Sequence, residues 1–166
     1  MPRIPLTLLL VSSLTLVQPV SVAAQEAAAT PEDAPETVTE TPAGLEILPA
    51  AGIDLDAYLW EKRVLVIFAD TPADPRFIKQ MEMIGERPRD LLERDVVVLT
   101  DTDPEPRTDV RKTLRPRGFA LVLVDKDGEV KLRKPAPWST REIARSIDKT
   151  PLRRQEIRDR SGSIGQ

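Results

Sequence analysis

Three short apolar runs limit what this chain can fold into more than any other feature. They span residues 64–68, 96–99 and 119–124. Each run is rich in β-branched or leucine side chains and lacks alternation of polar and apolar residues, which is typical of strands buried on both faces of a sheet. The runs therefore predict an α/β domain whose sheet is covered by helices on both sides.

Helical patterns separate the runs. Asp74-Pro75 predicts a helix start, because aspartate is a favoured N-cap and proline a favoured first residue. Ser139 and Glu142 form a capping box that opens another helix. Further helical segments are predicted at 88–93, 110–114 and from Pro151 to Arg158.

The third apolar run leads into a hairpin. Residues 125–128 read Asp-Lys-Asp-Gly, a turn signal, and residues 129–133 alternate charged and apolar side chains as an edge strand does. The resulting order is β-α-β-α-β-β-α, with about four strands in the central sheet. Parallel strands come first and a hairpin after them, which predicts a three-layer α/β sandwich.

The first 46 residues differ from the rest. Residues 1–24 carry Arg3, an apolar stretch and small residues up to Ala24, which predicts a signal peptide cleaved there. The apolar stretch is shorter than the about 20 residues of a membrane-spanning helix. We expect a periplasmic or secreted protein with no stable membrane span after cleavage; a retained anchor is the alternative.

Residues 25–46 predict a disordered acidic linker. They contain six acidic residues, no basic residue and almost no large apolar side chain, so they cannot bury enough surface to fold. An interaction tail is the alternative reading of this segment. We place a single domain at residues 47–160, a common size for one compact unit, and a flexible tail at 161–166.

The chain contains no cysteine and no histidine. Disulfide exchange and peroxidase chemistry through a cysteine sulfenate are therefore excluded, and so is an anchor on an acylated cysteine. The usual general base and the commonest soft metal ligands are also missing. We predict no catalytic residue, no cofactor and no metal ligand, and stability from packing without disulfides.

The order of the elements is similar to that of the thioredoxin-like fold. More specifically, the chain resembles the DUDES-type domain family, cysteine-poor thioredoxin-like domains of unassigned function in exported bacterial proteins and some extracellular matrix proteins. The residues that carry the resemblance are 54–60 with the strand up to Ala69, Asp74-Pro75-Arg76, 93–98, the hairpin 122–130, and 151–156. The resemblance implies a fold and a compartment, and no activity.

Redox members of the thioredoxin-like fold carry Cys-x-x-Cys at the start of the first helix, where the helix dipole lowers the thiol pKa. Here the same window runs from Asp70 to Pro75, and the slot of their cis-proline falls near Phe119. We take Asp70, Thr71, Asp74 and Arg76 as candidate binding residues on this face. A Thr71 nucleophile with a carboxylate base is the alternative, but Asp74 is better explained as an N-cap.

A second candidate surface is the basic C-terminal helix, with Arg153 and Arg154 as binding residues. Residues 47–166 hold 23 basic and 21 acidic side chains, so the domain is slightly basic. Glu156 and Asp159 alternate with the arginines, and ordinary pairing along the helix is the alternative reading. Nucleic-acid binding is not expected, because the chain has a pI near 5.2 and no recognised motif.

Asp101, Asp103 and Glu105 have a spacing that would suit Ca²⁺, but the twelve-residue loop pattern is absent and a solvated loop is favoured. The leading hypothesis is a non-enzymatic interaction module that binds a protein or an anionic envelope component. A cysteine-independent enzyme or Ca²⁺-dependent protein using acidic loop residues is the alternative. A purely structural envelope protein is the third possibility.

Overall fold

A computed structural model describes residues 39–40 and 44–163. The predicted signal peptide, most of the predicted linker and residues 164–166 lie outside these. The strands are β1 (Thr39–Glu40), β2 (Glu46–Pro49), β3 (Arg63–Phe68), β4 (Val96–Asp101), β5 (Ala120–Val124) and β6 (Val130–Lys134). The helices are η1 (Leu55–Tyr58), α1 (Pro75–Glu86), α2 (Pro88–Leu92), α3 (Asp109–Leu114), α4 (Thr140–Asp148) and α5 (Pro151–Ser163).

The strands form one mixed sheet in the order β1-β2-β4-β3-β5-β6. Strand β4 is parallel to β2 and β3, whereas β5 is antiparallel to β3 and forms the predicted hairpin with β6. The turn requires Gly128, whose φ is +79° and whose added Cβ would lie 2.9 Å from Leu59 Cδ2. The predicted parallel strands and hairpin are therefore confirmed.

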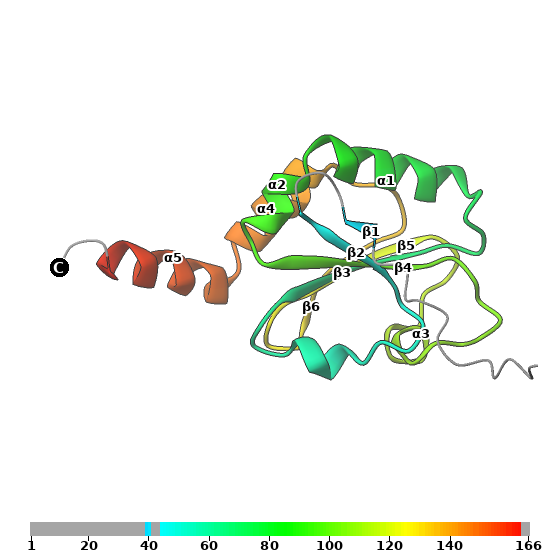
Figure 1. Cartoon of the computed structure of the whole chain (residues 1–166), viewed down its shortest axis with the longest axis horizontal. Helices are drawn as coiled ribbons and strands as arrows, with labels where there is room; N and C mark the ends of the chain where they lie inside the picture. The colour runs from blue at the N-terminus through cyan, green and yellow to red at the C-terminus, as the bar shows by residue number, and fades with distance from the viewer. Residues whose placement is uncertain (1–38, 41–43, 164–166) are drawn as a thin grey trace, which may run out of the picture. The chain divides into compact units, whose positions relative to one another are not determined.

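Helices cover both faces of the sheet, as the apolar runs without polar–apolar alternation predict (Figure 1). Leu65 and Ile67 of β3 face a core shared with α1, α2 and α4. Val66 and Phe68 face the opposite core, which α3 and η1 complete. The helix starts also follow the sequence: Asp74 caps α1, and Ser139 caps α4 by accepting the Glu142 N–H.

The sequence patterns do not predict β1 and β2, which extend the sheet beyond four strands. Leu45 is fully buried, and Glu46 begins β2, which pairs with β4. Leu45 and Glu46, at the C-terminal end of the predicted linker, therefore belong to the folded domain. At the other end α5 continues through residue 163, so the helix includes the start of the predicted tail.

Candidate binding face at the end of the sheet

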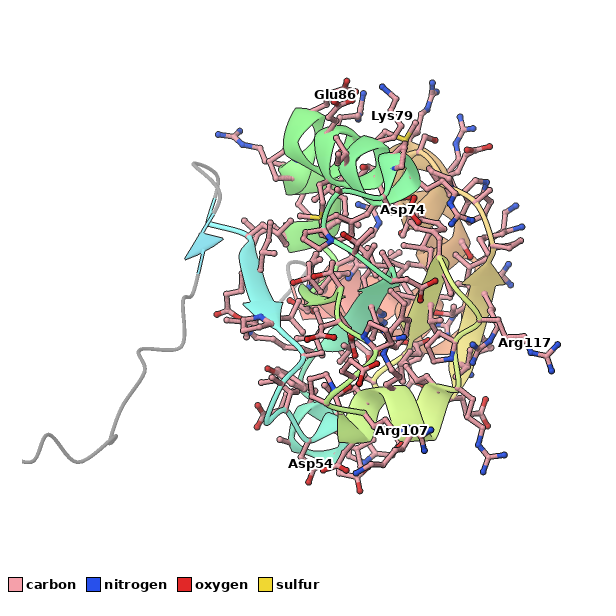
Figure 2. All side chains as sticks on the ribbon, turned by 90° about the vertical axis from the view of Figure 1, so that its right-hand side faces the viewer. Asp54, Asp74, Lys79, Glu86, Arg107 and Arg117 are labelled. Carbon is pink, nitrogen blue, oxygen red and sulfur yellow. The ribbon has the colours of Figure 1, made fainter. Side chains whose placement is uncertain are left out.

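Asp74 and Arg76 are joined at the start of α1. The Asp74 carboxylate accepts hydrogen bonds from the Arg76 backbone N–H (2.8 Å) and from Arg76 Nη2 (2.7 Å). The side-chain hydrogen bond from Arg76 holds the pKa of Asp74 below its ordinary value. Figure 2 views the molecule from this end, with Asp74 labelled near the start of α1. Asp74 is therefore both the predicted N-cap and the partner of a neighbouring cation.

Thr71 and Asp70 are exposed beside this pair. The Thr71 hydroxyl accepts a hydrogen bond from the Ala73 N–H at 3.3 Å. Within the described residues no hydrogen bond joins Thr71 to a carboxylate. A hydroxyl without a base in contact is not activated for attack, so the geometry does not support the Thr71 nucleophile.

Phe119 connects this face to the start of β5. The Arg76 guanidinium carbon lies 5.4 Å from the centre of the Phe119 ring, a cation–π distance. Gly118, at φ +58°, lies beside Asp70, because a Cβ added to it would be in van der Waals contact with Asp70 Oδ2, at 3.6 Å. The structure thus brings Asp70 and Arg76 together with the loop before β5.

A groove of ≈ 420 Å³ continues from Phe119 toward β6. We call it the basic groove. It is lined by Arg115, Arg117, Phe119, Ala120, Arg133, Lys134 and Pro135. Four of these side chains are cationic and none is acidic. Figure 2 labels Arg117, which projects on the side of β5 and β6.

No carboxylate among the described residues forms an ion pair with the cations of the basic groove. Within the described residues Arg115, Arg117 and Arg133 form no ion pair, and Lys134 Nζ lies over the Trp138 ring at 4.5 Å. The groove combines two segments that are far apart in the sequence, because β5 pairs with β6 and sets Leu121 opposite Lys134. Sequence reasoning missed it, since each segment alone contains only two cations.

The predicted binding role of Arg153 is not supported. Arg153 is only 6% exposed, and its Nη1 donates to Glu156 Oε2 at 3.0 Å while its Nη2 donates to the Glu93 carbonyl. Arg154 is exposed. The alternative reading, pairing between neighbours along the helix, is therefore present as the Arg153–Glu156 pair, and the Arg153 side chain is buried.

Arg153 belongs to a buried ion cluster formed by Arg63, Asp125, Arg153 and Glu156. Arg63, on β3, is fully buried; its Nε lies 2.7 Å from Asp125 Oδ1, and its Nη2 donates to Glu156 Oε1 at 3.0 Å. Burial alone would raise the pKa of Glu156, but hydrogen bonds from Arg63 and Arg153 outweigh it and lower this pKa to about 2. The cluster fastens α5 to the sheet.

The acidic loop after β4 does not form a cation site. Asp101 is buried and accepts hydrogen bonds from Arg111 Nη2 (2.6 Å) and from the Thr108 hydroxyl (2.7 Å). Asp103 accepts from the Glu105 backbone N–H instead. Among the described residues no group of three acidic side chains could hold a metal ion. The prediction of a solvated loop is wrong for Asp101, which is buried and bound to Arg111 and Thr108, whereas Asp103 and Glu105 are exposed as expected.

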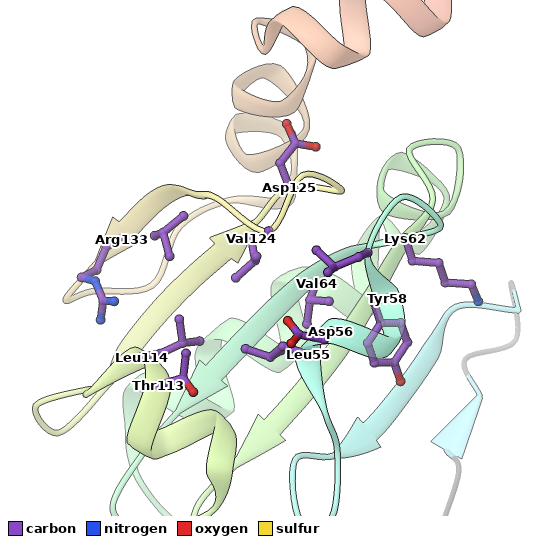
Figure 3. Close-up of a pocket in the computed structure, with 13 residues that line it drawn as sticks. Leu55, Asp56, Tyr58, Lys62, Val64, Thr113, Leu114, Val124, Asp125 and Arg133 are labelled. Carbon is purple, nitrogen blue, oxygen red and sulfur yellow. The ribbon is translucent and has the colours of Figure 1, made fainter.

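A second cavity of ≈ 200 Å³ lies between η1 and α3 (Figure 3). Its apolar lining includes Leu55, Val64 and Leu114. Of the charged side chains that line it, Lys62 pairs with Glu46 and Asp125 with Arg63, whereas Asp56 also lies there and Arg133 is shared with the basic groove. None of the candidate residues from the sequence lines this cavity.

No helix in the part of the chain that the structure describes is long and apolar enough to cross a bilayer. Among solved structures, the chain is similar to reduced Plasmodium vivax 2-Cys peroxiredoxin, with 16% identity over 63% of this chain and 85% of that one and a TM-score of 0.51. It is also similar to chloroplastic thioredoxin z, with 18% identity over 68% and 98% and a TM-score of 0.48. None of the curated proteins matches the sequence.

The likeness to the peroxiredoxin shows the fold alone. Thiol chemistry is impossible here, because the chain has no cysteine. Residues 54–156, more than half of the chain, match the family described as "Domain of unknown function (DUF4174)". The resemblance to a cysteine-poor thioredoxin-like family of unassigned function is thus confirmed, and the chain belongs to the DUF4174 family.

Proposed function

We propose that this chain is a non-catalytic, exported binding module that holds a protein or an anionic envelope component at the end of the sheet where β3 passes into α1. The observation that carries the proposal is the basic groove: three arginines without carboxylate partners among the described residues, beside the Asp74–Arg76 pair. Arginine recognises carboxylates and phosphates through paired hydrogen bonds, so these groups favour an anionic partner.

The alternative functions have weaker support. Among the described residues Thr71 forms no hydrogen bond to a carboxylate, and the Asp101 carboxylate is bound by Arg111 and Thr108. An enzyme or a Ca²⁺-dependent protein built on these acidic loops would need them free. A purely structural envelope protein would not need unneutralised arginines in a groove.

The test is crosslinking in cells of the tagged protein, followed by mass spectrometry. An Arg115→Gln/Arg117→Gln variant is compared with a matched Arg141→Gln/Arg145→Gln variant, which removes the same charge from exposed positions of α4. We expect a discrete partner in the wild type and the α4 variant and its loss in the groove variant. Absence of any partner, or equal capture by all three proteins, would contradict the proposal. Fractionation of the same cells tests export.

A further inference from the structure

The lining of the basic groove has two chemically different parts. Arg115, Arg117, Arg133 and Lys134 supply positive charge, whereas the floor is apolar: Pro135 is exposed there, beside the buried core residues Phe119 and Ala120, which are 1% and 6% exposed. A ligand that matches both parts carries several oxyanions and an apolar group between them. Inorganic phosphate has no apolar group, and it would leave the floor uncovered.

Strand β6 leads directly into the groove. It is the last strand of the sheet on this side, so its outer edge pairs with no other strand in the described part of the chain. Its final residues, Arg133 and Lys134, line the groove. An open strand edge can accept the backbone of an extended peptide, and neighbouring pockets then select its side chains.

We infer that the basic groove binds an extended acidic segment of a partner protein, with carboxylates at the arginines and one apolar side chain against Pro135. This inference rests on the proposed function and names the partner's chemistry. The edge of β6 would hold the peptide backbone, and the groove would select the side chains. Four cations in one groove match a segment with three or four acidic residues.

A membrane surface fits the groove less well than a peptide. Binding to a bilayer uses protruding apolar side chains that insert between headgroups. The large exposed apolar side chains, Trp60, Ile78, Leu92, Val130 and Ile157, do not line the groove, and the Phe119 ring is recessed. The observations therefore favour a peptide, and lipid binding becomes one outcome of the test.

The test is a fluorescence-anisotropy titration of the purified protein with a labelled peptide of sequence Asp-Glu-Phe-Glu-Asp, which carries four acidic residues. We expect saturable binding that weakens with salt. Arg115→Gln/Arg117→Gln should lower the affinity by about tenfold or more, because it removes two charge-assisted contacts. The matched Arg141→Gln/Arg145→Gln variant should lower it less than about twofold, since exposed distant charges are screened. A peptide with alanine in place of phenylalanine should bind more weakly.

Besides absence of peptide binding, three results would overturn the inference. Equal loss in the two double variants would mean attraction to net charge alone. Complete displacement by millimolar inorganic phosphate would mean a simple anion site. Tighter, arginine-dependent binding to phosphatidylglycerol vesicles than to the peptide would mean a membrane surface. Thermal unfolding of each variant verifies that it is folded.

The two experiments separate the inference from the proposed function. A partner captured in cells through Arg115 and Arg117, without binding of the peptide, would overturn the inference alone. Absence of any captured partner would overturn the proposed function, whatever the peptide titration gives.

Discussion

Two groups of arginines, one at each end of the sheet, are in opposite states. Where β3 begins, Arg63 and Arg153 are buried and paired with Asp125 and Glu156. At the other end the arginines of the basic groove are exposed and, within the described residues, have no carboxylate partner. Paired buried charges bind parts of the fold to one another, whereas unpaired exposed charges are available to a ligand. Substitutions at the two ends should therefore affect different measurements.

The largest effect is expected at the paired end. Arg63→Ala would leave the Asp125 carboxylate buried without its cation and weaken the attachment of Glu156. Removal of one member of a buried ion pair costs about 3–5 kcal/mol. We expect a loss of that size in the free energy of unfolding, measured by urea denaturation.

The matched comparison is Arg117→Ala, in the basic groove, which should change the unfolding free energy by less than about 0.5 kcal/mol. Equal effects of Arg63→Ala and Arg117→Ala would show that the two groups of arginines do not differ in their contribution to stability.

A pH titration sharpens the comparison. Because the pKa of Glu156 is lowered from 4.5 to about 2 in the folded protein, its stabilising contribution is present above pH 4.5 and is lost as the pH falls toward 2. The full shift would correspond to about 3 kcal/mol, and solvent screening of this partly exposed carboxylate reduces that to about 1–2 kcal/mol. Glu156→Gln should remove this part of the acid dependence. An unchanged acid profile in that variant would contradict the role of the cluster.

A smaller effect is expected at the start of α1. Asp74→Ala removes the acceptor for the Arg76 backbone N–H and the partner of its side chain. We expect a lower thermal midpoint than in the wild type, with a smaller decrease than in Arg63→Ala. Asp74→Asn keeps a capping oxygen and should recover most of the loss; no difference between alanine and asparagine would argue against capping.

The smallest effect on stability is expected in the basic groove. Arg115→Gln/Arg117→Gln breaks no ion pair among the described residues and reduces repulsion between like charges. The unfolding free energy should stay within about 0.5 kcal/mol of the wild type. A large loss of unfolding free energy would mean that these arginines have a structural role. The two groups of arginines would then not differ in their contribution to stability.

The sequence predicts the central elements because local signals and burial agree there. Residues 64–68 and 120–124 are apolar without alternation, and both segments lie in strands with two covered faces. The caps Asp74 and Ser139 are likewise local signals. Strand β2 gives a weak signal, since it has four residues and ends in proline, and pairing with β4 decides its conformation.

The charged sites could be predicted only in part. Asp74 and Arg76 are two residues apart, so their proximity follows from the helix start. Arg63 reads as the boundary of an apolar run, yet it is fully buried because residues from the hairpin and α5 surround it. The basic groove likewise depends on the pairing of β5 with β6. Such sites depend on contacts between segments distant in the chain, which one sequence does not reveal.

The position of Glu156 has a consequence for folding during synthesis. Glu156 lies 93 residues after Arg63, and the DUF4174 match also ends at this residue. A nascent chain that has not yet reached α5 already contains Arg63 and Asp125. It still lacks Glu156, which is a main acceptor for the Arg63 guanidinium. The domain can therefore complete its native charge pairing only when synthesis has passed residue 156. Recombinant versions shortened before that residue would lack the contact that fastens the last helix.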